Sequence, residues 1–167
     1  GKRYCDTIIE IESFIRNETN FAHKVRKKLG GMNNIVDVPI EGMEIHLWYD
    51  GEKEAIVIEE NHKTRRSSIT WNNVSAYGEN LDNISGNWVH VMYVDDLENP
   101  NQLLNIPINF SVDFCTKRSR EEYIRIINAA TIVFDSRERK HLYENIKTHT
   151  PLIFHDEYGC EAVIDGK

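Results

Sequence analysis

Five apolar runs between Met43 and Cys115 constrain the fold of this chain more than any other feature. Each run is closed by turn-forming residues, a pattern typical of β-strands joined by loops. The runs span residues 45–49, 55–58, 68–77, 88–94 and 106–114. The last run is the clearest, because apolar residues alternate strictly from Ile106 to Phe114, which predicts a strand with one buried and one solvent-facing side.

A hairpin signal joins the first two of these runs. Asp50-Gly51 lies between them, and Asp-Gly flanked by apolar residues favours a tight turn between antiparallel strands. The run from Trp88 to Val94 carries bulky side chains on both faces, which indicates a central strand or a curved barrel wall. We therefore predict an α+β fold in which residues 43–134 form a curved antiparallel sheet, or a partly open β-barrel, with a following helix.

A long N-terminal helix is predicted within residues 1–31. The apolar residues there recur at intervals of three, four and seven positions, and Gly30-Gly31 would end the helix. The recurring residues are Ile8, Ile11, Ile15, Ala22, Val25 and Leu29. Residues 17–20 have poor helix propensity, so two shorter helices are the alternative.

A second helix is predicted after the last apolar run. Ser119 and Glu122 have the spacing of a capping box, and apolar residues follow at helical spacing as far as Ala130. We expect this helix to cap one end of the barrel. Residues 131–134 are rich in β-branched side chains and fit either a short strand or the tail of that helix. Residues 135–167 are predicted to hold a C-terminal helix and a tail.

Length and composition limit the remaining choices. With 167 residues, of which 40% are hydrophobic, residues 1–167 are expected to form a single domain. A net charge of −7 argues against non-specific binding of nucleic acid or membrane by the surface as a whole. Three cysteines far apart in sequence define no disulfide framework, and no apolar run is long enough for a membrane span. We expect an intracellular protein, cytoplasmic or nuclear.

Several antiparallel strands followed by a capped helix resemble the pleckstrin-homology-like superfold, which includes the GRAM domains. The resemblance covers residues 43–134 and includes the run Ile69-x-Trp71-x-x-Val74 in the third strand. It implies a scaffold that binds phosphoinositides, peptides or proteins. The loop between the first two strands, where such domains carry basic residues for phosphoinositides, is acidic overall here (residues 50–54), so a protein or peptide partner is favoured.

Two kinds of side chain are candidates for partner binding. Tryptophan on a solvent-facing strand side anchors peptides or stacks on bases, and short basic clusters at strand ends bind acidic groups. The candidates are Trp48, Trp88, Lys63, Arg65, Arg66, Lys117, Arg118 and Arg120. They predict a non-catalytic recognition module for a protein or peptide, and the basic clusters leave nucleic acid open as a partner. We expect no catalytic residue, no metal site and no cofactor.

Two other functions are compatible with the sequence. Asp50, Glu59 or Glu60, and Lys63 are the residue types of a divalent-metal-dependent nuclease of the PD-(D/E)xK type, although their spacing departs from that pattern. The acidic surface also suits an inhibitor or immunity-type protein that blocks a basic partner.

Overall fold

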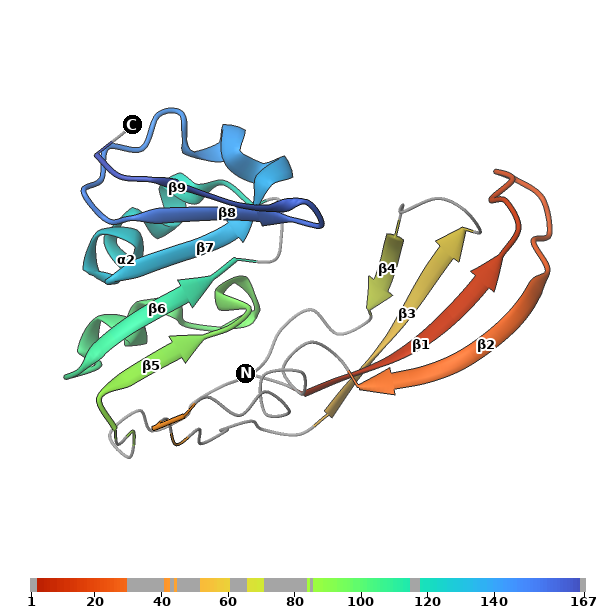
Figure 1. The fold of residues 1–167 in the computed structure, drawn as a ribbon, viewed down its shortest axis with the longest axis horizontal. Helices are drawn as coiled ribbons and strands as arrows, with labels where there is room; N and C mark the ends of the chain where they lie inside the picture. The colour runs from red at the N-terminus through yellow and green to blue at the C-terminus, as the bar shows by residue number, and fades with distance from the viewer. Residues whose placement is uncertain are drawn as a thin grey trace. The chain divides into compact units, whose positions relative to one another are not determined.

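The computed structural model describes residues 3–29, 41–42, 44, 52–60, 66–70, 84, 86–114 and 118–165. The chain forms two compact units, residues 2–73 and residues 74–167, of which the second also includes Gly1 (Figure 1). A single-domain organisation of residues 1–167 stays a prediction.

The N-terminal unit is a four-stranded mixed sheet. Its strands are β1 (Arg3–Ile11), β2 (Ala22–Leu29), β3 (Glu52–Glu60) and β4 (Arg66–Thr70), in the order β2-β1-β3-β4. β1 is antiparallel to β2 and parallel to β3, and β3 is antiparallel to β4. The best-buried apolar side chains of this sheet are Ile8, Ile11, Ala55 and Val57.

The predicted N-terminal helix is wrong, because β1 and β2 form an antiparallel pair over the same residues. Ile8 and Ile11 share a face in a helix, but in a strand they lie on opposite faces, and both are buried there. The segment of poor helix propensity is the connection between the two strands, and Asn17 adopts a positive φ of 66° within it. The β-branched Ile8 and Ile9 are also better suited to a strand than to a helix.

The C-terminal unit is a five-stranded sheet with helical connections. Its strands are β5 (Trp88–Val91), β6 (Asn109–Asp113), β7 (Ile132–Ser136), β8 (Leu152–Asp156) and β9 (Gly159–Val163), which lie in this order across the sheet. β5 to β8 are all parallel, and only β9 is antiparallel to its neighbour. The described helical segments are η2 (Val94–Asp96), η3 (Pro100–Asn105), η4 (Arg120–Tyr123), α2 (Ile124–Ala129) and η5 (Arg137–Tyr143).

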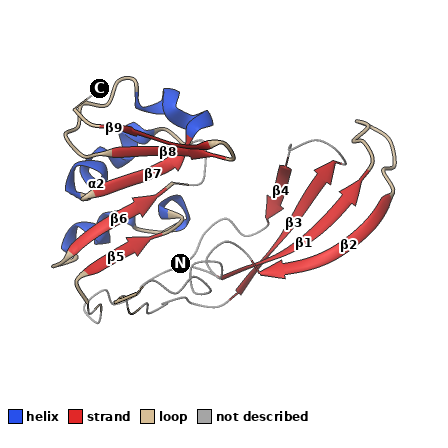
Figure 2. Ribbon diagram, viewed as in Figure 1, coloured by secondary structure: helices blue, strands red, loops and turns tan. Residues whose placement is uncertain are grey.

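The predicted curved antiparallel sheet or partly open barrel is wrong, because the connections between successive strands of this unit are long. Residues 92–108, 114–131 and 137–151 are long enough to cross back over the sheet, so the strands that they connect can run parallel. The helical segments lie on one side of the five strands (Figure 2), as consecutive right-handed crossovers require. The fold is therefore of the α/β type.

The core of this unit lies between the sheet and its helical segments. Alternate strand residues such as Phe110, Val112 and Val133 pack there against Ile126 and Ile127 of α2. The intervening strand residues, which include Trp88, His90, Ser111 and Phe134, consequently lie on the opposite side of the sheet.

Several predicted elements are confirmed in position. The run 55–58 lies in β3, and most of the run 106–114 lies in β6. η4 and α2 together occupy the place of the helix predicted after Ser119, and residues 132–134 belong to β7. The run 45–49 lies outside the described residues. None of the helices among the described residues has the length and apolar character that crossing a bilayer requires.

Candidate functional site

The carboxyl ends of β5, β6, β7 and β8 meet at one edge of the C-terminal sheet, because these strands are parallel. Ligands of open α/β sheets bind at this edge. Four aspartates lie at it or directly after it: Asp95, Asp113, Asp135 and Asp156. The edge therefore concentrates carboxylates at the position where an α/β protein binds its ligand.

Asp135 is fully occupied by hydrogen bonds within the protein. Its Oδ2 accepts from Nε of Arg120 at 2.9 Å and from the hydroxyl of Tyr143 at 2.8 Å. Its Oδ1 accepts from the backbone N–H of Ser136 at 2.7 Å and from Nε of Arg139. Burial and the negative charge of Asp135 raise the pKa of Tyr143, so its phenol remains protonated and donates. This carboxylate holds the edge together and is not available to a ligand.

Arg120 is the centre of this network, with a side chain that is 0% exposed. Its Nη2 lies 2.8 Å from Oδ2 of Asp135, and its Nη1 lies 3.5 Å from Oδ2 of Asp95. Nη1 also donates to the backbone carbonyl of Arg118, and the guanidinium lies 4.4 Å from the ring centroid of Phe114. Arg120 therefore fixes the segments that follow β5 and β6 to β7.

Asp113 differs from its neighbours, because none of the described residues forms a hydrogen bond to its carboxylate. Burial and the nearby charge of Asp135 raise the pKa of Asp113 from its ordinary value to about 7. A carboxylate with such a pKa at the ligand-binding edge of a sheet is a candidate proton acceptor. Asp113 is the centre of the candidate site.

Backbone strain marks the same edge. Tyr93 lies two residues after the end of β5 and has a φ of 58° and a ψ of 51°, the left-handed conformation that bulky residues rarely adopt. Such conformations concentrate at functional sites, where the surrounding structure maintains them. Tyr93 leads into η2, which carries Asp95, so the strain lies next to the carboxylates.

The raised pKa of Asp113 predicts a pH dependence of stability. The unfolded chain releases this proton near pH 4, whereas the folded protein retains it up to about pH 7. Between these values the unfolded state binds fewer protons, so the free energy of unfolding falls as pH rises, by roughly 2–4 kcal/mol, and is constant above the window.

Urea unfolding of the wild-type protein and of Asp113→Asn, from pH 4 to pH 8, measures this dependence. The difference in stability between the two proteins should grow in favour of Asp113→Asn as pH rises. A difference that stays constant across this range would show that the carboxyl of Asp113 has an ordinary pKa.

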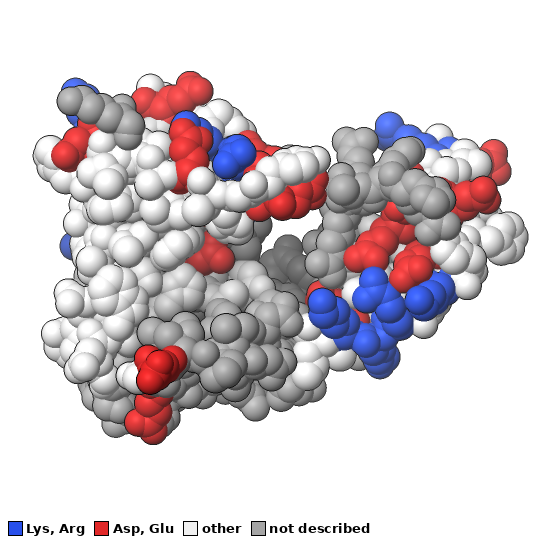
Figure 3. Space-filling model, in the orientation of Figure 1, with Lys and Arg blue, Asp and Glu red and all other residues white. Residues whose placement is uncertain are grey.

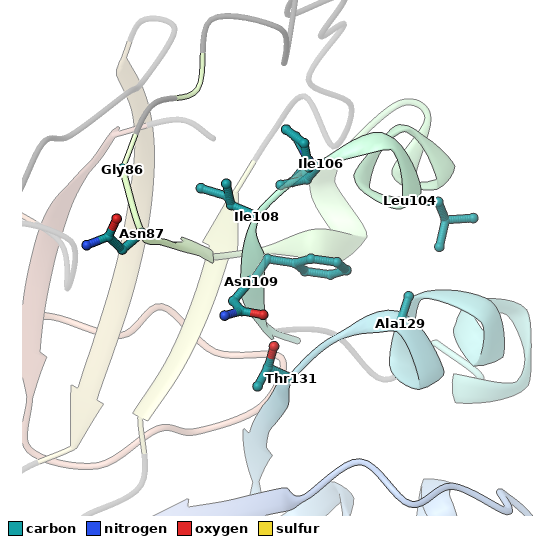
Figure 4. A pocket seen from close by; sticks show the side chains of 10 residues that line it. Gly86, Asn87, Leu104, Ile106, Ile108, Asn109, Ala129 and Thr131 are labelled. Atoms are coloured by element: carbon teal, nitrogen blue, oxygen red, sulfur yellow. The ribbon is translucent and has the colours of Figure 1, made fainter.

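A shallow groove of about 570 Å³ lies at the opposite, amino edge of the same sheet. Figure 4 shows Asn109 and Thr131 near each other at the starts of β6 and β7, with Ile106 and Ile108 beside them. No titratable side chain occurs among the described residues that line this groove. It therefore lacks the acid and base groups that the carboxyl edge provides.

The predicted partner-binding residues are in very different environments. Trp88 is 44% exposed on β5. Arg118 is exposed and donates to the backbone carbonyl of Asp95 at 3.2 Å, whereas Arg120 lies in the interior, away from the surface that a partner would contact. Arg66 belongs to β4, and its side chain is not described. Trp48, Lys63, Arg65 and Lys117 lie outside the described residues.

The N-terminal sheet carries a cluster of charges that largely neutralise one another. Arg26 donates to Oε1 of Glu10 at 2.9 Å and to Oε2 of Glu59 at 2.8 Å. Figure 3 shows basic and acidic side chains next to one another over this sheet. Of the nuclease set, Glu59 is therefore engaged by Arg26, while Asp50 and Lys63 lie outside the described residues. No group of potential metal ligands occurs among the residues that the structure describes.

The sequence analysis did not identify the aspartates at the carboxyl edge as candidate site residues. Asp95, Asp113 and Asp135 each lie within or shortly after an apolar run, and in a parallel sheet that position predicts a common edge. This pattern is visible in the sequence, but it places the aspartates at a common edge only when the strands are parallel. An antiparallel sheet was predicted, so the pattern was not recognised.

Solved structures of similar fold are ribokinase-family enzymes. The nucleoside kinase of Methanocaldococcus jannaschii, an archaeal member of the ribokinase family, has 12% identity and a TM-score of 0.62, and the match covers 100% of this chain and 72% of that one. Ribokinase from Giardia lamblia has 10% identity and a TM-score of 0.67, with 98% and 71% covered. The nucleoside kinase of Burkholderia thailandensis, solved with inosine, has 12% identity and a TM-score of 0.65, with 100% and 72% covered.

No protein-family model matches the sequence, and a comparison with curated proteins gives no match either. At 10–12% identity, the structural likeness establishes a ribokinase-like α/β fold. The predicted resemblance to pleckstrin-homology-like and GRAM domains is therefore wrong. Since the similar structures are sugar and nucleoside kinases, the prediction of a non-catalytic interaction module is also wrong, and neither the nuclease nor the inhibitor alternative matches them.

Proposed function

We propose that this chain binds the hydroxyl-bearing acceptor of a phosphoryl-transfer reaction, as a sugar or nucleoside kinase does. The observation that carries the proposal is Asp113, a carboxylate with a pKa of about 7 at the ligand-binding edge of a parallel sheet. The ribokinase-like fold supports it. An intracellular location is part of the same proposal.

In this reaction Asp113 acts as the general base. Its carboxylate accepts the proton of the acceptor hydroxyl while that oxygen attacks the terminal phosphorus of a nucleoside triphosphate. The bond between that phosphorus and the bridging oxygen breaks, and the nucleoside diphosphate leaves with the electron pair. A pKa near 7 suits this role, because the base is then substantially ionised at neutral pH and still basic enough to accept a proton.

The buried network around Arg120 positions this base. Asp135 accepts hydrogen bonds from Arg139 and Tyr143 as well as from Arg120, and Arg139 also donates to the backbone carbonyl of Phe114, which keeps the carboxyl ends of β6 and β7 in place beside Asp113. The sequence has no glycine-rich phosphate-binding loop of the GxGxxG or GxxxxGK(S/T) type. The proposal is therefore confined to the acceptor and to the base that deprotonates it.

An assay of nucleoside diphosphate formation from ATP, with pentoses and nucleosides as acceptors, tests the function. Asp113→Asn removes the base and should lower turnover about 100-fold, while the folded protein remains at least as stable at pH 7. Glu144→Gln, a change to an exposed carboxylate of the same unit, serves as the matched control and should leave turnover unchanged. Full turnover in Asp113→Asn, or no transfer to any pentose or nucleoside, would contradict the proposal.

A further inference from the structure

Two aromatic rings on β5 are anchored to one buried hydroxyl on the neighbouring strand. Nε1 of Trp88 donates to Oγ of Ser111 at 3.0 Å, and Nδ1 of His90 lies 2.8 Å from the same oxygen. Ser111 is 2% exposed, whereas Trp88 and His90 are exposed. The two rings therefore lie at the surface, while Nε1 of Trp88 and Nδ1 of His90 are held by the buried hydroxyl of Ser111.

The hydrogen-bond chemistry limits the roles that the atoms of this cluster can take. An indole N–H can only donate, so Oγ of Ser111 accepts from Trp88 and has its own hydrogen available for Nδ1 of His90. The side of the imidazole that faces the sheet is shielded from water although the ring is exposed on its outer side, and this partial desolvation lowers the pKa of His90 and favours the neutral ring. When Ser111 donates to Nδ1, the neutral ring carries its hydrogen on Nε2, which is the nitrogen that faces away from this hydrogen bond.

The ring of His90 is also fixed from the side. Phe134 on β7 meets it edge to face, with 5.5 Å between ring centroids and 86° between ring planes. A ring held by one hydrogen bond and one aromatic contact loses little further freedom when a ligand stacks on it, which favours binding.

This aromatic pair is continuous with the candidate site. Ser111 and Asp113 lie two residues apart on the same side of β6, and His90 pairs in register with Ser111, whereas Trp88 pairs with Asn109 and reaches Ser111 through its indole Nε1. At about 3.3 Å per strand residue, Asp113 lies about 7 Å further along the sheet than Ser111. A ligand with a planar ring at one end and hydroxyls at the other can therefore contact Asp113 together with the His90 ring and the part of the Trp88 indole that reaches Ser111.

We propose that Trp88 and His90 form a stacking platform for a nucleobase, so that the acceptor bound at Asp113 is a nucleoside and not a free sugar. This inference rests on the proposed function. Stacking on the indole supplies most of the affinity, and the Nε2–H of His90 donates to a ring nitrogen or carbonyl oxygen of the base. The platform therefore decides which class of acceptor binds, while Asp113 serves the hydroxyl that reacts.

Calorimetric titration of the full chain with inosine and with D-ribose tests the platform. Wild type should bind inosine at least tenfold more tightly than ribose, since one stacked base contributes about tenfold or more. Trp88→Leu should weaken inosine binding about tenfold and leave ribose binding within twofold. Trp88→Phe, which retains a stacking ring, should restore most of the preference, and Tyr158→Leu, which removes an exposed aromatic ring from the β8–β9 turn, should change neither affinity.

The same titrations separate the two proposals. Equal binding of inosine and ribose, both weakened by Asp113→Asn, would overturn the platform and leave the kinase function in place. A loss of both affinities in Trp88→Leu, with an unchanged urea midpoint, would also overturn the platform. If wild type binds neither ligand, both proposals fail.

Discussion

Replacement of Arg120 with methionine is expected to lower the free energy of unfolding by about 3–5 kcal/mol. The side chain is completely buried, and methionine fills much of its volume but carries no charge. The change leaves Asp135 in the interior with Arg139 as its remaining cation, and it removes the guanidinium that lies 3.5 Å from the buried carboxylate of Asp95. Leaving a buried charge without its partner costs far more than the intact ion pair contributes. The loss of stability therefore comes mainly from the buried carboxylates that no longer contact Arg120.

Urea unfolding followed by circular dichroism measures this loss. Arg125→Met is the matched control, because Arg125 is exposed on α2, and it should change stability by less than about 0.5 kcal/mol. The double change Arg120→Met with Asp135→Asn should cost less than the sum of the two single changes, since it removes the charge as well as its partner. A loss below about 1 kcal/mol for Arg120→Met would show that the network is not a structural centre.

Replacement of Ile127 with alanine is expected to cost about 2–5 kcal/mol of the free energy of unfolding. The side chain of Ile127 is 0% exposed and packs in the core between α2 and the sheet. Truncation removes buried apolar surface and leaves a cavity that the parallel strands cannot close easily. Ile124 lies on the same short helix but is 38% exposed, so Ile124→Ala should cost less than about 1 kcal/mol.

The pair compares the same substitution at two positions of one helix, so helix propensity cancels between them. Urea unfolding of both variants against wild type gives the comparison. Similar losses at Ile124 and Ile127 would mean that α2 does not bury the face that the structure assigns to it.

The N-terminal segment shows why hydrophobic spacing alone can mislead. Ile8, Ile11 and Ile15 have helical spacing, yet Ile8 and Ile11 are buried on opposite faces of β1. A strand with a buried apolar residue on each face shows no simple alternation, so its apolar residues can match the helical period by coincidence. The poor helix formers at residues 17–20 were the local signal for the true connection, and they correctly indicated a break.

The candidate site shows a different limit. Asp113 and Asp135 are far apart in sequence, and neither belongs to a recognisable motif. They become neighbours only because β6 and β7 are parallel and adjacent. The raised pKa of Asp113 needs both this neighbour and burial at the sheet edge, so no property of the residue within its own segment could have predicted it.

Local pattern by itself determined where several elements lie, among them β3, β6 and the helix that begins after Ser119. These positions follow from side-chain alternation, apolar stretches and capping chemistry, which act over a few neighbouring residues. Tertiary structure alone decided which strands pair and in which direction, because hydrogen bonds between distant strands leave no trace within either strand. That choice placed the aspartates on one edge and set His90 in register with Ser111, two residues before Asp113, and so brought side chains that are scattered in the sequence into one candidate site.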